Sequence, residues 1–279
     1  MALKLMYITN NPKVAIIAQQ AGVDQIFVDM EYIGKSLRQG GMDTVQNFHT
    51  IDDIKNIRKV IDKTSNTELL VRVNPIHDAS ESYCSSEDEI NQAIEAGADI
   101  IMLPYFKTVL EVKRFLNVVN HRVKTCLLLE TPEAVECIDD LLELDGINNI
   151  HIGLNDLSLG YKKKFMFELL CDGTVESLCH KIKSKNIPYG FGGIARVGKG
   201  ILPSELIIKE HYRLGSTAAI LSRSFCDANQ INDLSIIENL FLQGVKDIRN
   251  VERNCIDCDD YLDNLSDIED RINLYLNSK

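Results

Sequence analysis

The amino-acid sequence predicts an α/β fold, a (β/α)8 TIM barrel with extra C-terminal helices. Short apolar runs of strand length alternate with amphipathic helical segments through the first 230 residues, the order of elements that builds a parallel sheet covered by helices. A junction in which a helix ends in glycine and an apolar strand follows recurs, as AIEAGADIIMLP at 93–104 and more loosely as YRLGSTAAILSR at 212–223. The chain has 279 residues, and such barrels have typically ~250.

The elements follow one another regularly. Strands are predicted at residues 3–8, 25–30, 68–73, 99–105, 125–130, 149–154, 188–194 and 217–225. Helices are predicted between them at about residues 11–21, 51–63, 86–96, 107–120, 132–144, 164–186 and 203–214. The first helix begins at Asn11-Pro12 and is closed by Gly22, both standard end signals. A doubly wound sheet is the alternative, but no glycine-rich dinucleotide fingerprint follows the first strand.

We assign residues 1–230 to a catalytic barrel domain and residues 231–279 to a C-terminal helical extension. The extension contains one helix around 234–249 and an acidic amphipathic helix at 257–279. The second helix has no role inside an eight-unit barrel. We therefore expect its apolar stripe to pack on the barrel or on another subunit, and we expect a homo-oligomer.

Composition and charge exclude several classes of partner. The net charge is −11 and the pI is about 5.1, which argues against binding of nucleic acid or of an anionic membrane. No stretch has the length of a signal peptide or a membrane span. The eight cysteines are scattered, which favours reduced thiols in a cytoplasmic protein. Cys255 and Cys258 form a CxxC, but no second ligand pair is spaced for zinc.

Two carboxylates mark the ends of neighbouring strands. The segment 126–158 reads CLLLETPEAVECIDDLLELDGINNIHIGLNDLS, so Glu130 ends one apolar run and Asp156 follows the next. Thr131 and Pro132 give a helix start between them. The carboxyl ends of parallel strands share one face, and two carboxylates there suit a hard divalent cation that keeps waters and takes substrate oxygens. The alternative is that Glu130 caps its helix and Asp156 lies in a turn.

Other charged residues also fall at strand ends. Arg72 interrupts an apolar strand, where a charge is costly unless it meets an anion, so it binds either a substrate anion or, alternatively, Asp29 or Glu31 in an ion pair. The long loop after the second strand offers Arg38 and the histidine His49. His49 and His77 are the candidate acid/base groups, since both follow strands. The remaining histidines, His121, His151, His180 and His211, are interpreted as structural or surface residues.

Anion-binding groups are predicted after the last two strands. The segment GFGGIARVGKG at 190–200 combines glycines, which let backbone approach a ligand, with Arg196 and Lys199. Arg223 follows the eighth strand. Loops at these positions commonly hold phosphate or other anions in barrels. The alternative for the glycine-rich segment is a flexible turn.

These motifs resemble the HpcH/HpaI aldolase family, which includes the citrate lyase beta chain. LLLETPEAVECID and IHIGLNDLS look like its metal-site signature, and FVDMEY, LLVRVNP and AGADIIMLPY fit in order and spacing over about residues 3–225. The resemblance implies a phosphoenolpyruvate/pyruvate-type barrel, often oligomeric. It further implies Mg²⁺ or Mn²⁺ on Glu130 and Asp156, a 2-oxo acid chelating that metal, a catalytic Arg72, and backbone around Gly153, Leu154 and Asn155 that cradles the substrate carboxylate.

One position departs from the family pattern. The pyruvate aldolases of the family carry a histidine directly after the Asp-x-Glu of the second strand, where this chain has Tyr32. His49 or a metal-bound water would then take over proton transfer. We expect a metal-dependent aldolase, a carbon–carbon lyase acting on a 2-oxo acid, with an anionic or sugar-like partner held by Arg38, Arg196, Lys199 or Arg223. The alternatives are an acyl-CoA lyase of the citrate lyase or malyl-CoA type and a non-catalytic metabolite-binding barrel.

Overall fold

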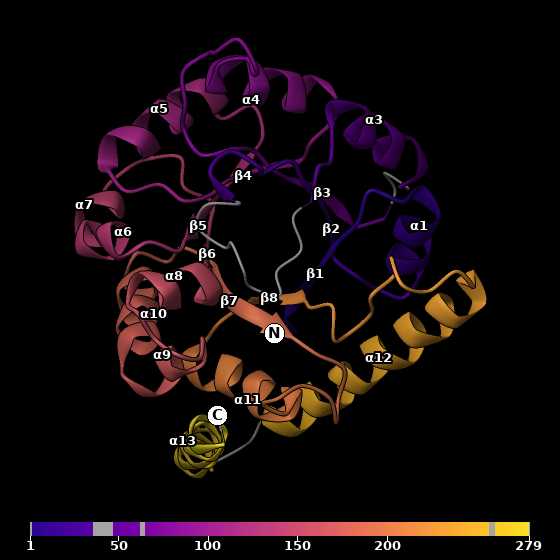
Figure 1. The fold of residues 1–279 in the computed structure, drawn as a ribbon, viewed down its shortest axis with the longest axis vertical. Coiled ribbons are helices and arrows are strands. Elements are labelled where there is room, and N and C mark those ends of the chain that lie inside the picture. The colour runs from indigo at the N-terminus through magenta and orange to yellow at the C-terminus, as the bar shows by residue number, and fades with distance from the viewer. Residues whose placement is uncertain (1, 36–46, 62–64, 257–259, 279) are drawn as a thin grey trace.

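The fold is that of a closed parallel β-barrel surrounded by helices (Figure 1). It is given by a computed structural model that describes residues 2–35, 47–61, 65–256 and 260–278. The strands pair in sequence order and β8 closes the barrel against β1. The strands are β1 (Lys4–Ile8), β2 (Gln25–Asp29), β3 (Glu68–Arg72), β4 (Ile100–Leu103), β5 (Lys124–Leu129), β6 (Asn149–Ile152), β7 (Tyr189–Ile194) and β8 (Ala218–Leu221). The predicted TIM barrel with extra C-terminal helices is confirmed.

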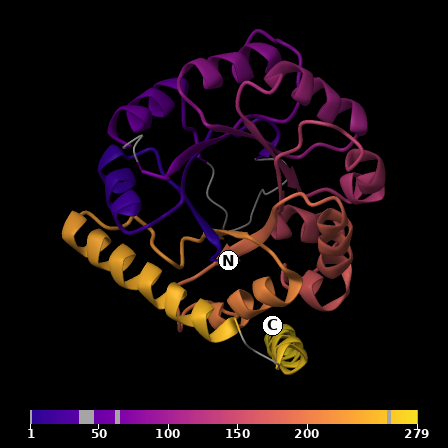
Figure 2. The same ribbon diagram turned by 180° about the vertical axis from the view of Figure 1, so that it is seen from behind.

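Helices cover the barrel on its outside. They are α1 (Pro12–Gln20), α3 (Ile51–Val60), α4 (Ser86–Glu95), α5 (Val109–Val119), α6 (Pro132–Glu136), α7 (Ile138–Leu141), α8 (Leu154–Gly160), α9 (Glu168–Cys171), α10 (Thr174–Ser184), α11 (Ser204–Leu214), α12 (Leu234–Cys255) and α13 (Tyr261–Asn277). Seen from the opposite end in Figure 2, α12 closes the ring because it packs against both α1 and α11.

Several of the predicted elements have different boundaries; the strand predicted at 217–225, for example, ends at Leu221. The helix predicted at 132–144 is divided into α6 and α7 at Cys137. The helix predicted at 164–186 is divided into α9 and α10, with Gly173 in a left-handed conformation between them. The strand predicted at 149–154 ends at Ile152, and Leu154 already begins α8. At the end of β6 the apolar run continues through Ile152 and Leu154, and apolar runs alone do not separate a strand from a buried helix.

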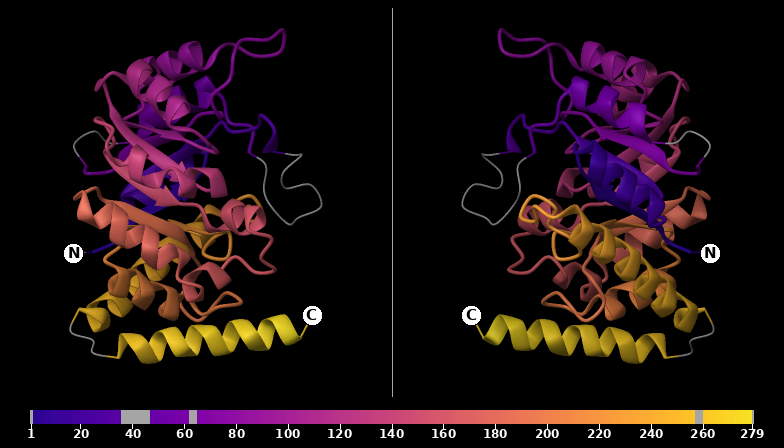
Figure 3. Two further views of the ribbon diagram at one scale, coloured as in Figure 1. Left: turned by 90° about the vertical axis from the view of Figure 1, so that its left-hand side faces the viewer. Right: turned by 90° about the vertical axis from the view of Figure 1, so that its right-hand side faces the viewer.

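The two C-terminal helices pack on the barrel. Helix α13 lies along the outside of the molecule beside α9 and α11 (Figure 3). Its Ile268 and Ile272 are buried in the same apolar core that joins the helices to the sheet, as expected for the stripe on its apolar face. No described helix has the length and apolar composition needed to cross a membrane.

The barrel interior below the carboxyl ends of the strands is filled by side chains. Alternate residues of each strand point inward, and these form one apolar cluster. Its buried members are Met6, Phe27, Leu70, Ile100, Met102, Cys126, Leu128 and Ala218. The barrel is therefore a packed core rather than a channel, and it provides a rigid floor for any site above it.

Candidate active site

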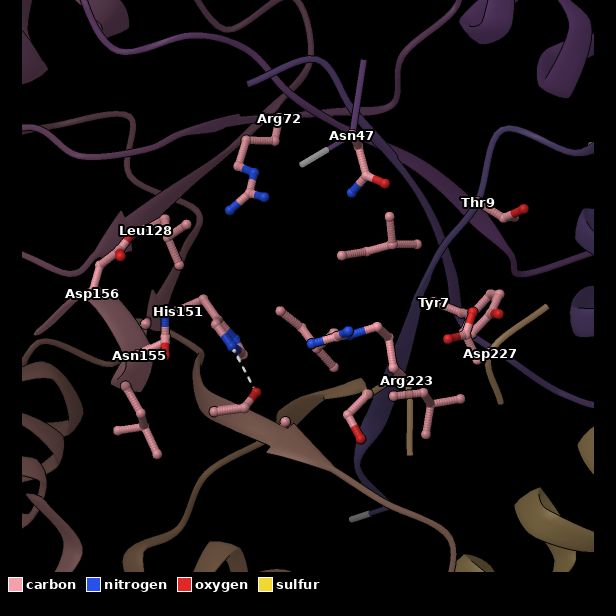
Figure 4. A pocket seen from close by; sticks show the side chains of 18 of the residues that line it. Tyr7, Thr9, Asn47, Arg72, Leu128, His151, Asn155, Asp156, Arg223 and Asp227 are labelled. Carbon is pink, nitrogen blue, oxygen red and sulfur yellow. Dashed lines mark hydrogen bonds between the residues drawn. The ribbon is translucent and has the colours of Figure 1, made fainter. Parts of the chain in front are cut away.

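A cavity of about 440 Å³ opens at the carboxyl ends of the strands (Figure 4). Its lining comes from β1, β3, β5, β6, β7 and β8, from the loops that follow them, and from the segment after β2. This is the face at which barrel enzymes carry their active sites. We refer to this cavity as the pocket.

The two predicted carboxylates both line the pocket, and both are buried. Glu130 directly follows β5, and its Oε1 accepts a hydrogen bond of 3.0 Å from the backbone N–H of Tyr105. Tyr105 has a φ of 48°, a left-handed conformation that residues other than glycine rarely adopt. At Gly153, a Cβ would lie 2.8 Å from Glu130 Oε2. Backbone geometry on two neighbouring strands thus fixes the position of Glu130.

The alternative roles of these carboxylates do not match the structure. Thr131, not Glu130, caps the helix that follows, since its hydroxyl accepts a hydrogen bond of 3.2 Å from the N–H of Ala134. Asp156 lies in the first helical turn of α8 rather than in a loop. A negative charge is favourable at this end of a helix.

The two carboxylates suit Mg²⁺ or Mn²⁺. Among the described residues, no group of three or more His, Cys, Asp or Glu side chains is placed to hold a metal ion. Glu130 and Asp156 both line the pocket and both provide hard oxygen atoms. A cation with only two protein ligands would complete its shell with water and substrate oxygens, as Mg²⁺ typically does.

Arg72, at the end of β3, forms the ion pair that was the alternative to substrate binding, yet it also lines the pocket. It lies beside Asp29 in the register of β2 and β3. Its Nε and Nη2 donate to the two carboxylate oxygens of Asp29 at 2.8 and 2.7 Å. Its Nη1 lies 3.3 Å from Glu31 Oε2. The guanidinium is thus held in one orientation before any ligand binds.

The charges of this pair shift both pKa values. Burial lowers the pKa of Arg72, but the negative charges of Asp29 and Glu31 outweigh it and raise the pKa. Burial likewise raises the pKa of Asp29, yet the charge and hydrogen bonds of Arg72 hold it well below its usual range. Both groups are therefore ionised at neutral pH.

Lys35 is a member of this cluster that sequence reasoning missed. Its side chain is only 4% exposed, lines the pocket, and places Nζ 3.3 Å from Asp29 Oδ2 and 3.2 Å from Glu31 Oε2. Two carboxylates and two cations thus balance in a buried quartet, Asp29, Glu31, Lys35 and Arg72.

His49 lines the pocket but cannot act as a simple base in the arrangement shown. Its Nδ1 accepts a hydrogen bond of 3.0 Å from the backbone N–H of Asp29, so the neutral ring carries its proton on Nε2. Burial lowers the pKa of His49 more than the nearby Asp29 and Asp53 raise it. The ring is therefore neutral, and the nitrogen left for a ligand is a hydrogen-bond donor.

The sequence matches a known family. The model of the HpcH/HpaI aldolase/citrate lyase family matches residues 4–187. The chain belongs to this family. No curated protein sequence matches it.

Solved structures of similar fold include family members. An HpcH/HpaI aldolase from Desulfitobacterium hafniense DCB-2 is 16% identical, with 89% of this chain and 93% of that chain covered and a TM-score of 0.59. A family protein from Burkholderia cenocepacia J2315 is 12% identical, with 85% and 95% covered and a TM-score of 0.61. Macrophomate synthase is 16% identical, with 79% and 77% covered and a TM-score of 0.55. At these identities the likeness concerns the fold.

The pocket of this HpcH/HpaI family member brings together most of the residues predicted from sequence. Those that line it are Arg72, His49, Glu130, Gly153, Leu154, Asn155, Asp156 and Arg223. Arg196 and Lys199 line a separate hollow beside α12. Arg38 lies outside the described residues.

Tyr32 and His77, which the sequence analysis also considered, are not among the described residues that line the pocket. Tyr32 is 41% exposed. His77 is held outside the pocket by contacts of its ring nitrogens with the carbonyl oxygens of Pro75 and Cys84. The position where pyruvate aldolases carry histidine therefore contributes no side chain here. Sequence reasoning also missed Asn47, His151 and Asp227, which do line the pocket.

Proposed function

We propose that this protein is a divalent-metal-dependent aldolase, a carbon–carbon lyase that acts on a 2-oxo acid of the pyruvate class. The observation that carries this proposal is the meeting of Glu130, Asp156 and Arg72 in one pocket at the carboxyl face of the barrel. Family membership supports the same class of reaction. Glu130 and Asp156 would hold Mg²⁺ or Mn²⁺, which when bound would supply Lewis-acid chemistry to the carboxylate and keto oxygens of the 2-oxo acid.

The role of Arg72 follows from its fixed orientation. Because Asp29 holds two of its nitrogens and Glu31 lies beside the third, the guanidinium needs no rearrangement when negative charge develops on the substrate. A single preorganised donor of this kind stabilises a transition state by about 3 kcal/mol. The backbone around Gly153, Leu154 and Asn155 lines the pocket next to the carboxylates and would hold the substrate carboxylate.

We assign His49 the role of a hydrogen-bond donor. Its Nδ1 is occupied by the N–H of Asp29, so the Nε2–H is the group that it can present to a substrate oxygen. This would orient the carbonyl or hydroxyl of the partner molecule. A His49→Gln variant, which keeps a donor near that position, should then retain more activity than His49→Ala.

The partner is proposed to be a hydroxylated or anionic aldehyde. The β1 and β8 side of the pocket carries polar side chains, namely Thr9, Asn10, Ser222, Arg223, Asp227 and Asn229. Figure 4 shows the Arg223 side chain reaching into the pocket. Arg223→Gln should therefore weaken the use of an acidic aldehyde, measured as KM, more than that of the uncharged glyceraldehyde. An equal rise in KM for both aldehydes would contradict the proposal that Arg223 binds an anionic group of the partner.

The test of the proposed function is deuterium exchange into the methyl group of pyruvate, followed by NMR in heavy water with Mg²⁺, with Mn²⁺ and with EDTA. It needs no knowledge of the partner. We expect exchange that requires metal and that falls by roughly 10³-fold in Asp156→Asn or Glu130→Gln, because metal catalysis supplies several kcal/mol. Exchange that persists in EDTA would contradict metal dependence. No exchange with either metal would shift the proposal to a thioester substrate, and a coenzyme A titration would follow.

A further inference from the structure

His151 occupies the floor of the pocket, although its place in a strand predicted only a structural role. It belongs to β6, where it lies beside Leu128 of β5 and Gly190 of β7 in the strand register. The residue is 2% exposed, yet it is among those that line the pocket. Figure 4 shows its ring below Arg72 and to the left of Arg223.

The ring is neutral and its orientation is fixed. Nε2 lies 3.1 Å from the carbonyl oxygen of Gly192, and because a carbonyl only accepts, Nε2 carries the proton. Burial lowers the pKa of His151 to about 4; the bond to Gly192 opposes this and the charge of Arg72 adds to it. Among the described residues, Nδ1 has no hydrogen-bond partner. The imidazole therefore acts here through its volume and one hydrogen bond rather than through its charge.

The glycines of β7 make room for this ring. A Cβ at Gly190 would lie 2.9 Å from His151 Nδ1 and 2.3 Å from the carbonyl oxygen of Ala218. Gly192 has a φ of 55°, and its Cβ would lie 2.8 Å from a methyl group of Leu154. At these two positions the glycine-rich segment is thus required by packing. The imidazole fills the space that β7 and β8, with Gly190 and Ala218, leave empty.

The ring lies directly below the level of the two carboxylates. His151 and Gly153 are two residues apart on one chain segment, so they face the same side of the sheet, about 6–7 Å apart along the strand direction. Gly153 is the residue against which Glu130 packs. A ligand held by Glu130 and Asp156 would therefore rest above the imidazole.

We propose that the ring of His151 sets the depth of the pocket and thereby selects short 2-oxo acids, such as pyruvate, over those with a longer chain. This inference rests on the proposed function, since it assumes a 2-oxo acid at Glu130 and Asp156. His151 is a specificity-determining residue in this view, not a proton carrier. Replacing it with alanine would join the space beside Gly190 and Ala218 to the pocket above.

The experiment compares deuterium exchange at C3 of pyruvate and of 2-oxobutyrate, which has one more carbon, in the wild type, His151→Ala and His151→Phe. We expect the rate ratio of 2-oxobutyrate to pyruvate to rise at least ~10-fold in His151→Ala, since one methylene group is worth roughly 10–200-fold in discrimination. His151→Phe keeps a ring, of somewhat larger volume, without the bond to Gly192, so its ratio should not rise above that of the wild type.

A second measurement does not depend on activity. Imidazole in the buffer should raise the thermal unfolding midpoint of His151→Ala, because it can fill the cavity that the substitution leaves. It should not raise that of the wild type or of His180→Ala, a variant with the same substitution at an exposed position of α10.

The outcomes separate the two proposals. If imidazole stabilises His151→Ala but the ratio of exchange rates is unchanged, the ring does not set the depth and the inference is overturned. If imidazole has no effect, the ring does not fill a separate space and the inference also fails. If the wild type exchanges neither 2-oxo acid, the proposed function fails, and the selection of short acids fails with it.

Discussion

On the β2–β3 side of the pocket, Asp29 and Glu31 are held by side-chain charges, whereas on the β5–β6 side Glu130 also accepts a backbone hydrogen bond and packs against a glycine. Asp29 has Arg72 at 2.7 Å and Lys35 at 3.3 Å. Glu130 has the N–H of Tyr105 and the bare Cα of Gly153. Removing one charged side chain should destabilise the β2–β3 side, because its partners stay buried without a counter-charge. Adding one methyl group at Gly153 should displace Glu130 on the β5–β6 side. The two sides should therefore respond differently to small changes.

The largest expected effect is that of Arg72→Met. Removal of one partner of a buried ion pair leaves the others uncompensated, and we expect a loss of about 3–5 kcal/mol in the free energy of unfolding. Arg114→Met is the matched control: Arg114 pairs with Glu87 and Asp78 but is far more exposed, so its loss should cost less than about 1 kcal/mol. Urea denaturation measures the free energy of unfolding of both variants.

The same substitution should change the response to acid. Since the folded-state pKa of Asp29 is held below its usual range, its ionised form stabilises the protein above the unfolded pKa of ~3.9. That stabilisation is lost as the pH falls from there toward the folded pKa. In Arg72→Met, burial still raises the pKa of Asp29 while the strongest opposing charge is gone, so acid unfolding followed by circular dichroism should begin at a higher pH. An unchanged midpoint would show that Arg72 does not hold the charge of Asp29.

Gly153→Ala tests the other side with a single methyl group. Its Cβ would lie 2.8 Å from Oε2 and 2.9 Å from Cβ of Glu130, closer than van der Waals contact allows, so the carboxylate must move. We expect the affinity for Mn²⁺ to fall by roughly 10–100-fold, the range seen when groups that orient metal ligands are altered, measured by electron paramagnetic resonance.

Gly173→Ala serves as its control. Gly173 has a φ of 85° but no atom within 4 Å of the added Cβ. It should cost stability through its left-handed backbone, about 1 kcal/mol, and leave Mn²⁺ binding unchanged. Equal Mn²⁺ affinities in Gly153→Ala and the wild type would show that the position of Glu130 tolerates displacement.

The sequence predicted the backbone-held side better than the charged side. Glu130 and Asp156 could be found because each comes at the end of an apolar run, and the start signal at Thr131 was confirmed by its hydrogen bond. Lys35 could not be found from the sequence, because its burial depends on the path of the chain after Glu31. The pairing of Arg72 with Asp29 was one of two alternatives that pattern alone left open.

Sequence reasoning misplaced two residues and one strand end, each for its own physical reason. In a strand buried on both faces, an apolar run does not reveal which side chains point inward, so His151 could not be assigned to the pocket. Arg196 follows β7 as predicted, but the direction of its loop carries it to α12. The early end of β6 was hidden because Ile152, Gly153 and Leu154 continue the apolar run.

The smallest expected effect comes from two helix-capping threonines, of which only one lies next to a predicted metal ligand. The hydroxyl of Thr131 is buried, donates to the carbonyl oxygen of Phe106 at 2.7 Å and caps α6. Thr108 caps α5 in the same way but is exposed. Thr131→Val and Thr108→Val should each lose about 1 kcal/mol of unfolding free energy. Only Thr131→Val should also weaken Mn²⁺ binding, by a few-fold, because Thr131 is bonded to Glu130 along the chain. An equal loss of Mn²⁺ affinity in both variants would mean that the caps act on the barrel as a whole, and no loss in either would leave Tyr105 and Gly153 as sufficient to hold Glu130.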